Sequence, residues 1–226
     1  MLTVTNLIGF GVGGGAADAV VTLIGNTTSA NGTNSPKTYT GFGNAPATAF
    51  YVVGFGWRTG LSTTVTSVTI GGVTAAVATD GINPASMQDG AVEQRVALYG
   101  ATVSSGVALD VVLTMSNNNA STGIGMWQLD NLLSTTPTYS NSSTADPASF
   151  TTNISAGGVA IVYGHCIASG TVFANVAENF DEASDATKRN MGGSAAFAAA
   201  QSGLVITSTL SGAGGQQHNH VIGVWR

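Results

Sequence analysis

Charged residues are scarce in this chain of 226 residues. Lys, Arg, Asp and Glu make up 8% of the sequence, whereas about 25% is usual for a soluble domain. Only six basic residues stand against eleven acidic ones, so the basic surface that nucleic-acid binding requires is not expected. A helix bundle or a coiled coil is excluded as well, because both need Glu and Lys at helical period.

Cysteine and long apolar runs are nearly absent. Cys166 is the one cysteine, so no internal disulfide can form, and its place in the apolar run 159–167 predicts a buried core residue. No apolar run is long enough to span a membrane. Residues 1–8 lack the basic start of a signal peptide. We therefore expect a protein made in a cytoplasm, with no membrane partner.

Small residues replace the missing charge, and their arrangement indicates β-strands. Gly, Ser, Thr and Asn occupy 97 of the 226 positions. Residues 109–115, 150–154 and 204–210 alternate apolar and polar side chains with period two, as half-buried strands do. The runs 49–57 and 159–163 are apolar on both faces, which is typical of central strands covered on both sides.

Two local patterns sharpen this prediction. In the run 49–57, one face of the strand carries large side chains. The opposite face carries the small residues Val52, Gly54 and Gly56. Such a strand suits the close approach of another backbone. Gly71 and Gly72 separate two β-branched segments and predict a two-residue hairpin turn.

About twelve candidate strands with no clear linker predict an all-β protein, a single jelly-roll-like β-sandwich over residues 45–226. Residues 194–201 have helical propensity between Ser194 and Gly203, but their β neighbours favour a strand. The residues that we expect inside the sandwich lie on apolar faces of these strands: Leu109, Val111, Leu113, Ile161, Leu204 and Ile206.

Residues 1–44 are predicted to be a glycine-rich arm and loop. Five glycines fall within residues 9–15, and residues 26–44 are rich in Gly, Ser, Thr and Asn. Loops of that length are uncommon inside compact domains and usually mark function or contact. We expect this part of the chain to contact another subunit or a capsid, with strand addition at a sheet edge as a plausible mode.

His218 and His220 form the most suggestive cluster of metal-ligating residues. Positions two apart on a strand face the same way, so both imidazoles could bind one metal ion. A third ligand is needed, and His165 is the only other histidine. The sequence favours a polar start to the final strand over a metal site.

Residues 178–185 hold four of the eleven carboxylates, and Lys188 and Arg189 follow them. Asp181, Glu182 and Asp185 are oxygen donors that suit calcium, but the spacing lacks the glycine and terminal glutamate of an EF-hand. A solvated loop with local ion pairs is the favoured interpretation. No Gly-x-Ser-x-Gly elbow or phosphate-binding loop is found.

The large aromatic residues are predicted to be core residues, because they lie within the expected strands. An exposed aromatic platform for a sugar is the alternative. The residues concerned are Tyr51, Phe55, Trp57, Trp127, Tyr163 and Trp225.

Several segments between residues 45 and 226 resemble a group of virion proteins of tailed bacteriophages. The matching segments are Val68–Ala75, Arg95–Gly100, Gly123–Trp127, Ser155–Ile161, Glu178–Asp181 and Gly192–Phe197. The resemblance implies a β-sandwich or jelly-roll module attached to the outside of a head or tail. It carries over no catalytic residue, and residues 1–44 lie outside it.

The resemblance and the charge-poor composition together predict a virion structural protein that decorates and stabilises a phage capsid. Its expected partners are a major capsid or tail protein and, in a homotrimer, further copies of the chain. No catalytic, cofactor-binding or metal-binding residue is predicted. A tail, fibre or baseplate module that binds a host-surface glycan is the alternative, and a virion-borne hydrolase of cell-wall or capsule sugar is a third possibility.

Overall fold

The computed structural model describes residues 16–29, 35–60, 63–79, 88–89, 92–116, 121–166, 170–183, 188–211 and 218–226. These residues form eighteen β-strands in four antiparallel sheets, and no helix occurs among them. The prediction of an all-β protein is confirmed. The prediction of one sandwich of about twelve strands is wrong, because the chain builds two sandwiches.

Strands β1 to β10 form the first sandwich. Its six-stranded sheet has the order β1-β10-β3-β8-β6, with β7 also paired to β8, and is called inner sheet 1. Its four-stranded sheet, β2-β9-β4-β5, is called outer sheet 1. The strands are β1 (Val20–Ser29), β2 (Lys37–Tyr39), β3 (Ala49–Gly60), β4 (Val65–Ile70), β5 (Val73–Thr74), β6 (Ala76–Thr79), β7 (Gln88–Asp89), β8 (Val92–Val103), β9 (Val111–Met115) and β10 (Ser121–Asp130).

Strands β11 to β18 form the second sandwich. Inner sheet 2 has the order β11-β18-β13-β16-β15, and outer sheet 2 has the order β12-β17-β14. The strands are β11 (Tyr139–Ser143), β12 (Ala148–Ile154), β13 (Gly158–Cys166), β14 (Gly170–Ala174), β15 (Ala177–Ala183), β16 (Arg189–Phe197), β17 (Gln201–Ser211) and β18 (His218–Trp225).

The two sandwiches repeat one topology. In each, the first strand pairs with the last, and the last pairs with the third. The second strand pairs with the penultimate one, which pairs with the fourth. This is the strand order of a jelly roll, a double-sheet solution that buries both inner faces. The chain is therefore a tandem of two jelly-roll-like sandwiches.

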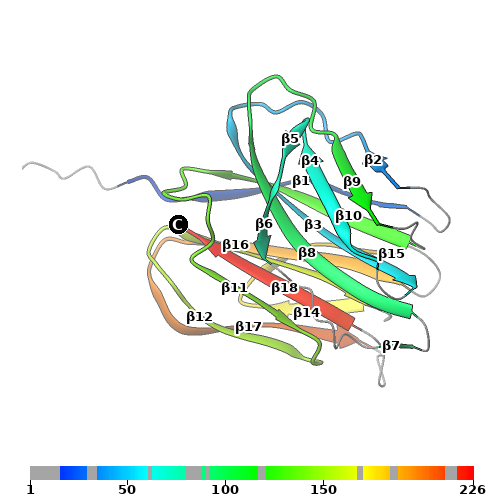
Figure 1. Cartoon of the computed structure of the whole chain (residues 1–226). Helices are drawn as coiled ribbons and strands as arrows, with labels where there is room; N and C mark the ends of the chain where they lie inside the picture. The colour runs from blue at the N-terminus through cyan, green and yellow to red at the C-terminus, as the bar shows by residue number, and fades with distance from the viewer. Residues whose placement is uncertain are drawn as a thin grey trace, which may run out of the picture.

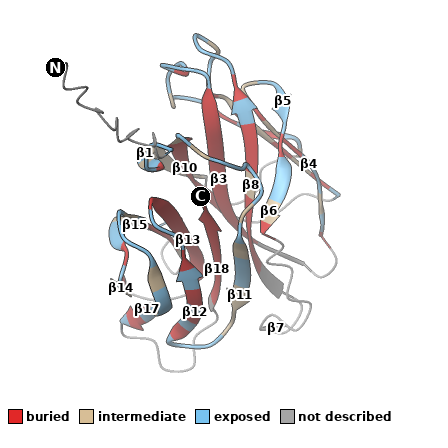
Figure 2. Cartoon of the chain, turned by 90° about the vertical axis from the view of Figure 1, so that its left-hand side faces the viewer, coloured by how far each residue is buried: buried red, intermediate tan, exposed pale blue. Residues whose placement is uncertain are grey.

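The four sheets stack as layers, with the two inner sheets in the middle (Figure 1). Figure 2 shows the same layering from the side, with buried residues concentrated in the inner strands. One apolar cluster lies between outer sheet 1 and inner sheet 1, a second between the inner sheets, and a third between inner sheet 2 and outer sheet 2. The inner sheets are covered on both faces.

This layering explains the runs that are apolar on both faces. In β3, Tyr51 and Val53 pack toward outer sheet 1, whereas Val52 packs toward inner sheet 2. In β13, Ile161 faces inner sheet 1 and Val162 faces outer sheet 2. The sequence prediction that both runs are central strands is confirmed.

Glycines let the two inner sheets approach closely. A Cβ atom at Gly54 would lie 2.6 Å from Cδ2 of Tyr163, and one at Gly56 would collide with His165. The predicted close approach to the small face of β3 therefore occurs. Its partners are bulky side chains of β13 rather than a backbone, so each large residue fills the space that a missing Cβ leaves.

Hydrogen bonds join the inner sheets across this contact. The Tyr163 hydroxyl lies 2.7 Å from the Gly123 carbonyl oxygen of the opposite sheet. The Trp127 indole Nε1 donates to Asn179 Oδ1 at 2.8 Å. These bonds satisfy polar groups that would otherwise be buried without partners.

A short sequence repeat marks the duplication. Ile124-Gly125-Met126-Trp127 and Ile222-Gly223-Val224-Trp225 occupy the last strand of each sandwich, β10 and β18. In both, the tryptophan ring lies against the glycine two residues earlier. Both tryptophans belong to the cluster between the inner sheets.

The structure tests two local predictions, the turn at Gly71–Gly72 and the strand at 194–201. The Gly71–Gly72 hairpin is confirmed, with positive φ at both glycines and Ile70 paired with Val73. The strand prediction for 194–201 holds for residues 194–197, which end β16, while 198–200 form the bend before β17.

The arm and loop predicted over residues 1–44 contain regular structure. Residues 26–29 continue β1 and 37–39 form β2, because their β-branched residues pair with β10 and β9. Residues 1–15 and 30–34 lie outside the described residues.

Five of the six predicted core residues, Leu109, Val111, Leu113, Ile161 and Ile206, are at most 1% exposed. Leu204 is half-buried at the edge of the third cluster. The prediction of a buried Cys166 is also confirmed.

Replacing Leu113 with Ala should test the first core. The side chain is buried between inner and outer sheet 1, so its truncation is expected to lower the free energy of unfolding by about 2–5 kcal/mol. Urea denaturation measures the loss. The exposed Val205 is a control, and a Leu113→Ala loss as small as that of Val205→Ala would contradict the packing.

Replacing Gly54 with Ala should weaken the contact between the inner sheets. The added methyl group would overlap the Tyr163 side chain, and we expect a loss of about 1–3 kcal/mol from overpacking. Gly25→Ala is the matched control, because a Cβ there would lie at an ordinary 3.4 Å from the Phe42 ring. Equal melting temperatures of the two variants would contradict the close approach.

Candidate binding surface

The three histidines that were candidate metal ligands do not lie together in the structure, because His165 is on the other face of inner sheet 2 from positions 218 and 220. Strand β18 pairs His218 with Cys166 and His220 with Gly164, so both histidine positions lie on the face of inner sheet 2 that meets outer sheet 2. His165 lies on the opposite face, against Gly56, and cannot complete a site with His220. Among the described residues, no group of three or more His, Cys, Asp or Glu is placed to hold a metal ion.

The acidic segment 178–185 is part of a strand rather than a loop. Residues 177–183 form β15, an edge of inner sheet 2, and residues 184–187 lie outside the described residues. Asp181 forms an ion pair with Arg189 at 2.5 Å and accepts a hydrogen bond from the Thr171 amide at 2.8 Å. The predicted local ion pairing is thus present at Asp181, where it ties β14, β15 and β16 together.

The six aromatic residues of the sequence prediction are all buried. Tyr51, Phe55, Trp57, Trp127, Tyr163 and Trp225 are each at most 1% exposed. Their interpretation as core residues is confirmed, and none of these six offers an exposed ring on which a sugar could stack.

Of the five described basic side chains, three are buried and two are partly exposed but engaged in hydrogen bonds. Lys37, Arg95 and Lys188 are buried. Arg189 is held by Asp181, and Arg226 donates to the carbonyl oxygens of Ala17 and Gly157. The side chain of the sixth, Arg58, lies outside the described set. The described surface therefore combines neutral polar groups with a few carboxylates and the partly exposed Arg189 and Arg226.

Lys37 is the most unusual of these cations. Its Nζ is buried without a hydrogen-bond partner and lies 5.6 Å from the centre of the Tyr39 ring. Burial lowers the pKa of Lys37 to about 8, because a charged amine is costly to remove from water. The cation–π contact with Tyr39 offsets part of that cost.

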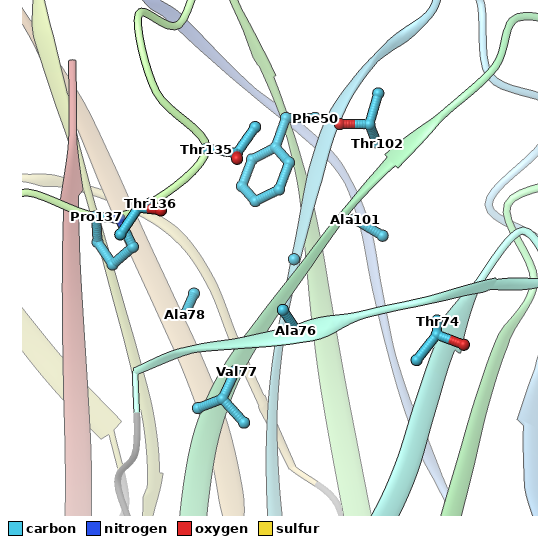
Figure 3. A pocket seen from close by; sticks show the side chains of 11 residues that line it. Phe50, Thr74, Ala76, Val77, Ala78, Ala101, Thr102, Thr135, Thr136 and Pro137 are labelled. Carbon is cyan, nitrogen blue, oxygen red and sulfur yellow. The ribbon is translucent and has the colours of Figure 1, made fainter.

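A shallow groove lies where the two sandwiches meet, and we call it the seam groove. It has a volume of about 250 Å³, less than the 300–1,000 Å³ typical of small-molecule sites. Figure 3 shows the Phe50 side chain between the connector that carries Thr135–Pro137 and strand β6. The lining residues are Phe50, Thr74, Ala76–Ala78, Gly100–Thr102 and Thr135–Pro137.

The lining of the seam groove is neutral. Threonine hydroxyls and small apolar side chains supply it, and no titratable side chain takes part. A second hollow of about 230 Å³ shares Phe50, Thr102 and Thr135 with it and adds Asp130. Asp130 accepts hydrogen bonds from Gln128 Nε2. Such a lining is suited to contact with an uncharged surface rather than to proton transfer.

One exposed apolar side chain, Val77, lines the seam groove. Among the described residues, six large hydrophobic side chains are exposed. Val77 lines the groove, Val73 is next to the lining residue Thr74, and Leu133 follows Leu132 of the second hollow.

Sequence reasoning missed the seam groove because it expected one sandwich. The groove forms only where the connector between the sandwiches, residues 131–138, runs beside the first sandwich. The repeated Ile-Gly-x-Trp segment, recognised as an internal duplication, was the available signal for two units and hence for a seam.

Replacing Lys37 with Met should stabilise the protein, by about 1–3 kcal/mol at pH 7, because it removes a buried donor without a partner. The folded-state pKa of Lys37 lies below its usual value of 10.5, so the unfolded state binds more protons between pH 8 and 10.5. The destabilisation by Lys37 is therefore full below about pH 8 and fades as the pH rises. Denaturation of both proteins from pH 7 to 10.5 tests this, and a gap independent of pH would contradict it.

No helix among the described residues is long and apolar enough to cross a membrane. Comparison of the chain with protein-family models, with curated proteins and with solved structures gave no match.

Proposed function

We propose that this protein is a structural component of a tailed-phage virion, attached to the outside of the capsid and stabilising it. The observation that carries the proposal is the scarcity of free basic groups on the described surface, since Lys37, Arg95 and Lys188 are buried and the partly exposed Arg189 and Arg226 are engaged in hydrogen bonds. A neutral surface loses little free energy of hydration when a partner covers it. Such a surface suits a permanent place in an assembly.

The outer faces of the stack support this role. In outer sheet 1, Thr38, Val112, Thr69 and Thr74 form one row across all four strands. In outer sheet 2, Ser149, Thr207 and Ala174 form a similar row. Both rows point away from the core and carry no charge. Each sandwich therefore presents a neutral sheet face that can lie against another protein.

The sheet edges support the role as well. Soluble monomers usually protect edge strands with lysine or proline. Strand β1 is a ten-residue edge of inner sheet 1 and contains neither, although its pairing is interrupted by a register shift between Leu23 and Gly25. An edge of this kind is suited to burial in an assembly. A homotrimer with the major capsid protein or a tail protein as partner remains the predicted arrangement.

Attachment to the particle is expected to be nearly insensitive to salt, because neutral contacts are not screened by ions. Raising NaCl from about 0.05 M to 0.5 M should change the protein bound per purified particle by less than about twofold. Quantitative mass spectrometry of sedimented particles measures this ratio, and electron microscopy with a labelled antibody locates the protein.

A loss of tenfold or more at high salt would contradict a neutral interface. Absence of the protein from purified particles would overturn the proposed function. Label confined to fibres or the baseplate, together with binding of the purified protein to host-surface glycan, would favour the alternative function as a glycan-binding tail module.

A further inference from the structure

We propose that the seam groove and the edge of β6 receive the N-terminal segment, residues 2–10, of a neighbouring copy as an added strand. This inference rests on the proposed function as an assembly protein, and it names the partner and the contact. Added strands gain affinity from main-chain hydrogen bonds and specificity from pockets for alternate side chains.

The acceptor is an unpaired edge beside a neutral groove. Among the described residues, β5 pairs only with β4 and β6 pairs only with β8. No described strand pairs with the other side of Val73–Ala78, whereas Thr79 is buried and its hydroxyl donates to the Ile222 carbonyl oxygen of β18. Val77 is 52% exposed and Val73 is 41% exposed, and no lysine, arginine or proline lies within the stretch to discourage pairing.

The donor has the matching sequence. Residues 1–17 have no charged side chain, in keeping with the neutral groove. Leu2, Val4, Ile8 and Phe10 would share one face of an extended segment, and Asn6 is the one polar residue on that face. The groove volume of about 250 Å³ accommodates a large side chain such as Ile8 or Phe10.

The attachment point of the donor lies on the opposite edge of the sheet from the acceptor. The Ala19 amide donates to the Gly157 carbonyl oxygen at 2.9 Å, and Asn131 Nδ2 donates to the Asp18 carbonyl oxygen at 3.2 Å. The chain then enters β1. Strands β1 and β6 are the two edges of inner sheet 1 (Figure 2), four strand spacings or about 19 Å apart.

The reach of the segment exceeds the distance between the two edges, so its length allows contact with its own β6 as well as with a neighbour's, and the proposed assembly role is what favours the neighbour. Fifteen extended residues reach about 50 Å, far enough to enter an adjacent molecule. Donor and acceptor on opposite edges make a head-to-tail contact, which closes into a ring or continues as a filament. A ring of three would give the predicted trimer.

Cross-linking of the full-length protein tests the contact. Two single variants, Val4→Cys and Val77→Cys, are mixed and treated with a short bismaleimide reagent. The native Cys166 stays unreactive because it is buried, and burial raises the pKa of its thiol to about 12. The matched control is Val172→Cys, an exposed valine of the edge strand β14 in outer sheet 2.

Mixed dimers between Val4→Cys and Val77→Cys are expected in at least about tenfold greater yield than with Val172→Cys, because docking raises the effective concentration of the thiols. Equal yields would overturn the inference. A chain with both Val4→Cys and Val77→Cys that cross-links only within itself at every concentration would also overturn it, since the segment would then occupy its own groove.

Charge at the edge gives a second readout. Val77→Lys should weaken self-association in sedimentation velocity by about tenfold or more, which corresponds to 1.4 kcal/mol, whereas Val172→Lys should leave it unchanged. A wild-type protein that stays monomeric at every concentration would overturn strand donation. If the protein binds particles but the two variants do not cross-link, strand donation is wrong and the proposed function stands. If the variants cross-link but the protein is absent from particles, the proposed function is wrong and strand donation stands.

Discussion

The close contact between the two inner sheets is the constraint on which the rest of the structure depends. Tyr163 and His165 of β13 occupy the space over Gly54 and Gly56 of β3. Because these large side chains face glycines, two complete sandwiches can share one densely packed layer between them. The contact makes β3, β10, β13 and β18 central strands with both faces buried, and it creates the seam along which the groove lies.

The two sandwiches contribute equivalent strands to this contact, although their sequences differ. Each sandwich contributes its last strand, with a tryptophan folded over a glycine, to the same apolar cluster. The polar bonds across the layer differ, since Tyr163 reaches a backbone carbonyl and Trp127 reaches Asn179. Hydrophobic packing therefore repeats between the halves, while hydrogen bonds specific to one half fix how they face each other.

The distribution of charge connects the fold to the proposed role. A chain with few lysines and arginines has few charged side chains to place on its sheet edges. Of the described basic side chains, three are buried in the core and two are hydrogen-bonded to neighbouring groups. Neutral outer faces, unguarded edges and a neutral groove result. Strand donation through the N-terminal segment and attachment to a particle would both use these features, because each buries polar but uncharged surface at low cost.

The sequence by itself determined the all-β class, the central strands, the Gly71–Gly72 turn and most of the core, including Leu113 and Cys166. These follow from local rules, since side chains alternate along a strand and a turn requires particular residues. Only the tertiary structure decided that there are two sandwiches, that His165 and His220 lie on opposite faces, and that a groove runs along the seam. Those features depend on which distant strands pair and how sheets stack, and period-two patterns are the same for either arrangement.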